Sequence, residues 1–171
     1  MKKEKMNDKG FSLVELIIVI AIMAVLIVVL APQYLKYVEK SRNSTDLQNA
    51  TEMVTAFQVY ASDPDVASAD AYVAEKAFTV TVSSSGTTIA GDNATAAKAA
   101  LFEAGLATAK DANPATTCVS RTNWKSYQIT GTVQKNGSIT FVYTSSKDGD
   151  DGTGDTTTFA NAMAGKTSSG S

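Results

Sequence analysis

The chain has 171 residues and a formal net charge of −2, which suits one globular domain with a short additional segment and gives no sign of a nucleic-acid partner. It contains no histidine and a single cysteine, Cys118. A histidine-based catalytic triad, a zinc cluster of histidines or cysteines, and an intrachain disulfide are therefore excluded. We expect a protein that is not an enzyme, because no set of residues supplies acid, base and nucleophile together.

The N-terminus carries the strongest signal. A lysine-rich leader precedes a segment from Phe11 to Ala31 in which only Ser12 and Glu15 are polar. About twenty helical residues at 1.5 Å each reach about 30 Å, the thickness of a bilayer's hydrocarbon core. The segment therefore predicts a membrane-spanning helix. A cleaved secretory signal is disfavoured, because its apolar region would be unusually long and Pro32 would directly follow the cut.

A plain membrane anchor does not explain Glu15. A carboxylate inside a spanning helix costs on the order of 2.5 to 3.5 kcal/mol, less near the helix end, so it indicates a function and requires a partner. Cleavage between Gly10 and Phe11 would create an α-amino cation four residues from this carboxylate. The cut would thus supply the partner that Glu15 needs.

The sequence KGFSLVE at residues 9–15, followed by the apolar run and Pro32, resembles the N-terminal signature of type IV prepilins. The resemblance implies that a membrane-bound prepilin peptidase and methyltransferase cuts after Gly10 and methylates the new amine of Phe11. It further implies that Glu15 pairs with the N-terminal amine of a neighbouring subunit during assembly. The signature is specific, but it covers only the first fifth to third of the chain.

Residues 33 to about 61 predict the second half of the same helix. Pro32 has no N–H to donate, so we expect a kink there. Beyond it, apolar residues recur at three- and four-residue steps and predict an amphipathic stripe formed by Leu47, Ala50, Val54, Phe57 and Ala61. We interpret the charged residues of this segment, including Glu39 and Asp46, as a mostly solvated surface. Pro64, between two aspartates, ends the helix.

The remaining elements predict a sheet and a short helix. Residues 78–82 alternate as a half-buried strand, and Asp92 or Asn93 is expected to cap a helix that ends near Leu106. A hairpin is expected from residues 126–134 and 138–144, with Lys135-Asn136-Gly137 at its turn. Trp124 is expected in the core or at the sheet edge. The fold is therefore predicted to be α+β and pilin-like: a long N-terminal helix, with an apolar transmembrane half and an amphipathic half, packed on a C-terminal antiparallel β-sheet.

The C-terminal region offers a weak metal candidate. Its glycine-rich loop contains oxygen ligands that would suit calcium, but their spacing is not that of an EF-hand, so an ordinary solvated loop is preferred; the candidates are Asp148, Asp150, Asp151 and Asp155. No other cofactor is expected. Many type IV pilins close this region with a disulfide. This chain must hold it by strand pairing, by packing of Phe159 and Met163, or by a metal.

The prepilin resemblance implies a domain organisation and a set of partners. Residues 1–10 would be the cleaved leader, 11–32 the transmembrane and filament-core helix, and 33–171 the extracellular globular domain. The partners would be other copies of the chain in a helical filament, the prepilin peptidase, the inner-membrane assembly platform, its assembly ATPase and the membrane itself. The subunit would lie in the cell membrane before assembly and in a surface pilus afterwards.

The implied function is that of a structural subunit of a type IV pilus, used for adhesion, twitching motility or biofilm formation. A major pseudopilin of a type II secretion or DNA-uptake system is the alternative. A membrane-anchored binding module that does not polymerise would leave Glu15 and the junction between Gly10 and Phe11 unexplained.

Overall fold

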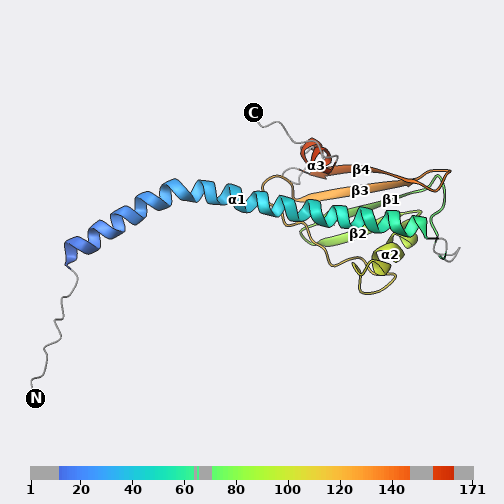
Figure 1. Cartoon of the computed structure of the whole chain (residues 1–171), viewed down its shortest axis with the longest axis horizontal. Helices are drawn as coiled ribbons and strands as arrows, with labels where there is room; N and C mark the ends of the chain where they lie inside the picture. The colour runs from blue at the N-terminus through green and yellow to red at the C-terminus, as the bar shows by residue number, and fades with distance from the viewer. Residues whose placement is uncertain (1–11, 64, 66–70, 147–155, 164–171) are drawn as a thin grey trace, which may run out of the picture. The chain divides into compact units, whose positions relative to one another are not determined.

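The computed structural model describes residues 12–63, 65, 71–146 and 156–163. In chain order they form helix α1 (Leu13–Ser62), strands β1 (Ala77–Ser83) and β2 (Gly86–Gly91), helix α2 (Ala94–Glu103), strands β3 (Ser126–Val133) and β4 (Ile139–Ser146), and helix α3 (Thr156–Met163) (Figure 1). The chain divides into two compact units, Met1–Val38 and Glu39–Ser171, each of which contains part of α1.

In the first unit, the described part of α1 is apolar and exposed up to residue 37. Its large side chains are half to three-quarters exposed, from Val19 at 50% to Val28 at 75%. An 18-residue window of the helix meets the length and composition expected of a membrane span, and none of it is buried. The helix is assigned as continuous through Pro32, and the kink expected there stays a prediction.

In the second unit, four antiparallel strands form one sheet in the order β2-β1-β3-β4. Side chains alternate between two faces, as in any strand, and one face is buried. The inner face comprises Phe78, Val80, Val82, Ile89, Tyr127, Ile129 and Val133. The predicted strand and hairpin are thus confirmed, and β2 completes the sheet.

The second half of α1 packs on this inner face and completes the α+β arrangement. The ring of Phe57 is fully buried and lies 4.8 Å from that of Phe78, edge to face, and 6.3 Å from that of Phe141. Of the predicted stripe, Ala50 and Phe57 are buried, whereas Leu47 and Val54 are half-buried against the core. The buried stripe of α1 is wider than predicted, and it also includes Met53, Ala56 and Tyr60.

Two glycines shape the sheet. Gly131 pairs with Phe78 in the neighbouring strand, and a Cβ at residue 131 would lie 2.5 Å from the Phe78 ring. Only glycine therefore lets this ring lie across β3. Gly137, in the turn between β3 and β4, has a φ of 83°, as the Asn-Gly turn signal predicted.

The expected side-chain cap of α2 is wrong. Asn93 precedes the helix but makes no capping hydrogen bond. Its amide instead accepts from the Val73 N–H at 2.8 Å and donates to the carbonyls of Val73 and Lys76, each at 3.0 Å. The other candidate, Asp92, pairs with Lys76 at 3.1 Å. Asn93 is buried, so three hydrogen bonds to the chain before β1 satisfy its amide better than one bond to a helix end would.

The C-terminal helix α3 packs by an aromatic cluster. Phe159 is fully buried, stacked on Tyr127 at 4.7 Å and edge-on to Trp124 at 5.2 Å. Met163 also packs against the core. Of the two places expected for Trp124, it occupies the core. Packing of Phe159 and Met163, one of the three ways expected to hold the C-terminal region, is present.

The opposite face of the sheet, here called the outer face, is made of the alternate residues that point away from α1. All are exposed or half-buried. They are Ala77, Thr79, Thr81, Ser83, Gly86, Thr88, Ala90, Ser126, Gln128, Thr130, Thr132, Thr140, Val142, Thr144 and Ser146.

A fragment of residues 34–171 should fold as a soluble monomer, and Phe57→Asp should unfold it. Removing this ring costs about 3–5 kcal/mol, and burying a charge costs more, against a total stability of about 5–15 kcal/mol. Val59→Asp is the matched control, because Val59 lies on the same helix and is 65% exposed. Urea unfolding followed by circular dichroism measures both. A fragment that tolerates aspartate at residue 57 as well as at residue 59 would show that the face of α1 that packs on the sheet has been wrongly assigned.

Candidate functional site

Glu15, the residue singled out by the sequence, closes the N-terminus of α1. The N–H of Ser12 donates to the Glu15 carboxylate at 2.8 Å, and the Ser12 hydroxyl accepts from the Val14 N–H at 3.4 Å. This is a variant of the Ser-x-x-Glu capping box in which the serine hydroxyl bonds the N–H of Val14 rather than that of Glu15, and it satisfies N–H groups that have no partner inside the helix. The Ser-x-x-Glu signal is present in the sequence at residues 12–15, but the prediction for Glu15 rested on its charge alone.

The capping box fixes where the Glu15 carboxylate lies. It is attached to the first turn of a helix whose free N–H groups and dipole favour negative charge. Ionised, a carboxylate has about four acceptor positions, so one hydrogen bond leaves room for a cation. The expected cleavage junction, Gly10 and Phe11, lies outside the described residues, and so do all four calcium candidates: Asp148, Asp150, Asp151 and Asp155. The part of the chain that is described contains no cluster of potential metal ligands.

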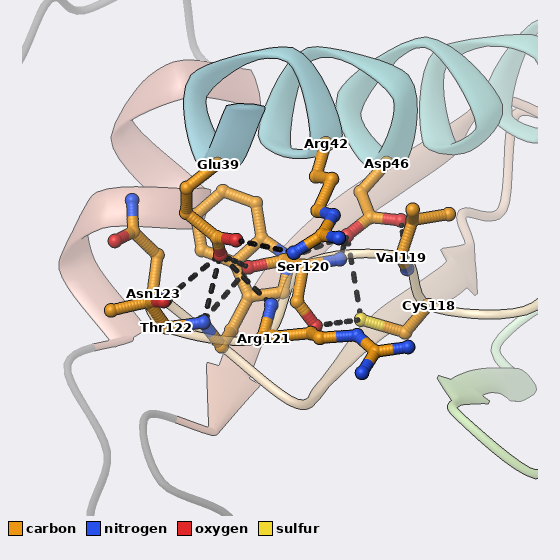
Figure 2. A network of polar contacts seen from close by, with 10 residues as sticks. Glu39, Arg42, Asp46, Cys118, Val119, Ser120, Arg121, Thr122 and Asn123 are labelled. Carbon is orange, nitrogen blue, oxygen red and sulfur yellow. Dashed lines mark hydrogen bonds and ion pairs between the residues drawn. The ribbon is translucent and has the colours of Figure 1, made fainter. Parts of the chain in front are cut away.

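A second polar site joins α1 to the segment that precedes β3. Figure 2 shows Glu39 and Asp46 on one side of α1, with residues 118–123 facing their carboxylates. The two residues are seven apart, which places them on the same face of the helix, about 10 Å from each other along its axis. We call this arrangement the carboxylate clamp.

At one end of the clamp, a single oxygen of Glu39 collects several donors. Oε1 accepts from the Ser120 hydroxyl at 2.7 Å and from the N–H groups of Arg121 and Thr122, both at 2.8 Å. The N–H of Asn123 contributes a longer bond of 3.4 Å. The other oxygen, Oε2, lies 3.6 Å from the Arg42 guanidinium. The turn at residues 120–123 is thus built around a negative charge from α1.

At the other end, Asp46 is fully buried and uses both oxygens. Oδ1 accepts from the Val119 N–H at 2.8 Å. Oδ2 accepts from the Ser120 N–H and from the Trp124 indole N–H, each at 2.9 Å, and from the Cys118 thiol at 3.4 Å. A buried charge without donors would cost several kcal/mol, so these bonds are what makes the position tolerable.

The interpretation of Glu39 and Asp46 as solvated residues is therefore wrong. Glu39 is 9% exposed and Asp46 is 0% exposed. The helical pattern could not show this, because the donors lie more than seventy residues away in a segment without periodicity.

Titration of the clamp follows from its geometry. Burial acts to raise the pKa of Glu39, but the hydrogen bonds from the turn outweigh it and lower that pKa from its ordinary value of 4.5 to about 2. Burial and the nearby Asp46 carboxylate raise the pKa of Cys118 to about 12. A thiol so reluctant to ionise is a poor nucleophile.

The comparisons with known proteins agree with the N-terminal signature. Residues 5–31 match the model of the prokaryotic N-terminal methylation motif. The chain is 37% identical over 59 residues to a type IV major fimbrial protein FimA of Dichelobacter nodosus, covering 34% of this chain and 38% of that protein. It is 39% identical over 54 residues to a second FimA of that organism, covering 32% of this chain and 35% of that protein.

These matches confirm the resemblance to type IV pilins at the N-terminus. The chain spans little more than a third of the length of these curated relatives. No solved structure matches the chain significantly.

Glu39→Gln should remove an acid-sensitive part of the domain's stability. Because the pKa of Glu39 is lower in the folded state than its ordinary value, this carboxylate stabilises the fold above about pH 4.5, and the stabilisation is lost as the pH falls toward 2. We expect the variant of fragment 34–171 to be about 2 kcal/mol less stable at pH 6, with the difference shrinking below pH 4.5. Urea denaturation midpoints measured across this pH range, with exposed Glu52→Gln as the control, test this expectation. A stability difference between variant and wild type that does not change with pH would contradict the clamp.

Proposed function

We propose that this chain is the structural subunit of a type IV pilus, held first in the membrane and then polymerised through its N-terminal helix. The observation that carries the proposal is the methylation motif at residues 5–31 in front of a helix that is apolar, long enough to span a bilayer and uncovered. The similarity to type IV major fimbrial proteins of D. nodosus supports it. A subunit of this kind needs no catalytic residue and no cofactor.

The apolar part of α1 suits two successive environments. In a bilayer its exposed side chains would contact lipid, and in a filament they would contact the same helix of other copies. Both environments exclude water, so the exchange costs little hydrophobic free energy. The exchange is driven by close helix packing and by a cation that pairs with the Glu15 carboxylate. The sequence does not contain the complete G-x-x-x-x-G-K-[ST] motif of a nucleotide-binding loop, so an assembly ATPase and its membrane platform would supply the work of extraction.

The proposed role of Glu15 is to select the register of assembly. After cleavage behind Gly10, the amine of Phe11 would be a cation at the end of the helix. Copies offset along the filament would bring the amine of one subunit to the Glu15 carboxylate of another, in a core where an unpaired charge is costly. We further propose that the globular unit forms the filament surface, which would serve in adhesion, motility or biofilm formation.

Processing is the first test. We expect the mature protein to begin at Phe11 with a methylated amine, because Gly10 gives the peptidase a residue without a side chain just before the helix. Mass spectrometry of sheared surface fibres measures this directly. An intact leader, or a chain that starts at Pro32, would rule out the prepilin interpretation. If the chain is found in short cell-bound fibres of a secretion system rather than in long surface fibres, the pseudopilin alternative is correct.

Substitution of Glu15 is the second test, and the capping box determines its design. Glutamine can still accept the Ser12 N–H, since a capping box takes Glu or Gln, but it has no charge to pair with an amine. Glu15→Gln should therefore preserve the cap, membrane insertion and leader removal, while filament yield falls as it does in Glu15→Ala. Ser12→Ala, which removes only the long bond to Val14, should still give filaments.

Leader removal by immunoblot and filament yield by shearing are measured in the same strains. Normal filaments from Glu15→Gln would show that Glu15 acts through the cap rather than through its charge. Normal filaments from Glu15→Ala would show that it has no role in assembly.

A further inference from the structure

The outer face of the sheet carries no charged residue. With 19% of the chain charged, a face of this size would carry about three charges if they were spread evenly. The residues are instead mostly threonine and serine, with Gln128 near the centre. Charged residues lie just beyond the strand ends, where Lys76 pairs with Asp92 at 3.1 Å and Lys135 with Glu75 at 3.4 Å. The depletion of charge at the centre, inside a charged rim, is a feature that this face shares with protein interfaces, although the centres of those interfaces are more apolar.

Hydroxyl groups on this face form an ordered array. Thr79 lies opposite Thr130 in the register of β1 and β3, with their hydroxyl oxygens 3.2 Å apart. The hydroxyls of Ser126 and Ser146 are 2.7 Å apart across β3 and β4. Each hydroxyl has one donor and two acceptor positions, so these bonds leave capacity for a further partner. The bonds also limit the rotation of the side chains, which lowers the entropy lost on binding.

We propose that the outer face binds the outer face of a second copy of this chain, and that this contact joins neighbouring filaments side by side. A hydroxyl array is complementary to itself, because every group both donates and accepts. A neutral face meets its copy without repulsion, as a two-fold contact between identical surfaces requires. The face presents no aromatic side chain for stacking on a sugar ring and no charge for a lipid headgroup or a nucleic acid. A second copy is therefore the partner that its chemistry fits best.

The size of the face predicts when the contact forms. Four strands about 4.8 Å apart and seven residues of about 3.3 Å each give an area of about 450 Å² per partner, or about 900 Å² in total. Stable pairs bury about 1,200–2,000 Å², so isolated copies should stay monomeric. Many copies fixed on one surface would bind through avidity. This step rests on the proposed filament, although any dense display of the chain should show the same adhesion.

The test places a charge at the centre of the face. Gln128→Lys is close in size to the native residue and exposed, so the fold should survive. Thr108→Lys, on an exposed loop after α2, is the matched control, and Gln128→Thr keeps the face neutral. Thermal unfolding of each full-length chain checks that it folds. Wild-type filaments should bundle in electron micrographs, and at 10 mM salt Gln128→Lys should reduce the bundled fraction by at least about fivefold, because repulsion then extends about 30 Å.

Two rescues distinguish the contact from a general effect of charge. Salt at 0.5 M should restore bundling of Gln128→Lys filaments, and so should mixing them with Gln128→Glu filaments at low salt. The proposal is wrong if wild-type filaments stay single, if Gln128→Lys filaments bundle normally, or if Thr108→Lys has the same effect. It is also wrong if single filaments gather only when a neutral polysaccharide is added, since the face would then bind glycans.

Vesicles separate this inference from the proposed function. Lipid vesicles that carry the full chain at high density should cluster in light scattering, and those with Gln128→Lys should not. If the vesicles cluster as expected but the cells make no filaments, the proposed pilus function is wrong and the proposed self-binding of the outer face is supported. If filaments form but neither filaments nor vesicles associate, the proposed pilus function is supported and the proposed self-binding of the outer face is wrong.

Discussion

The carboxylate clamp is the constraint on which the rest of the globular unit depends. Glu39 and Asp46 hold the turn before β3 at two points on one face of α1. Asp46 also binds the indole of Trp124, which contacts Phe159 of α3. The start of β3, one of the two inner strands, and helix α3 are therefore positioned from the same carboxylate. This chain has no disulfide to hold its C-terminal region, and the clamp and the aromatic cluster provide that attachment with hydrogen bonds and packing.

The clamp also explains why two acidic residues can lie in a core. Oriented N–H groups replace the water that a carboxylate loses on burial, and several of them on one charge outweigh the desolvation. Without the carboxylates, the N–H groups of residues 119–123 would lose the acceptors that the fold gives them. The buried carboxylates thus need the N–H groups of the turn as donors, and those N–H groups need the carboxylates as acceptors. Hydrogen bonds are directional, so they fix the orientation of this segment on α1. A purely apolar contact would not fix it.

Much of the fold could be predicted from the sequence because it follows from periodicity. The apolar run, the amphipathic stripe around Phe57, the alternation at residues 78–82 and the Asn-Gly turn are local patterns with a direct physical meaning. The clamp could not be predicted, because a charged residue on an amphipathic helix is normally solvated and the pattern of α1 says nothing of donors seventy residues away. Asn93 misled for the same reason, since a residue suited to a helix cap found better partners in Val73 and Lys76.

Three carboxylates of α1 share one kind of chemistry and differ in how far they are satisfied. Glu39 and Asp46 are buried, and between them they accept from seven other residues of the domain, beside the Arg42 ion pair. Glu15 is exposed and accepts one hydrogen bond among the described residues, from its own helix end. Burial closes the first two to a partner outside the fold. Glu15 has both the capacity and the position, at the end of an uncovered apolar helix, to be satisfied fully only when another molecule brings a cation to it.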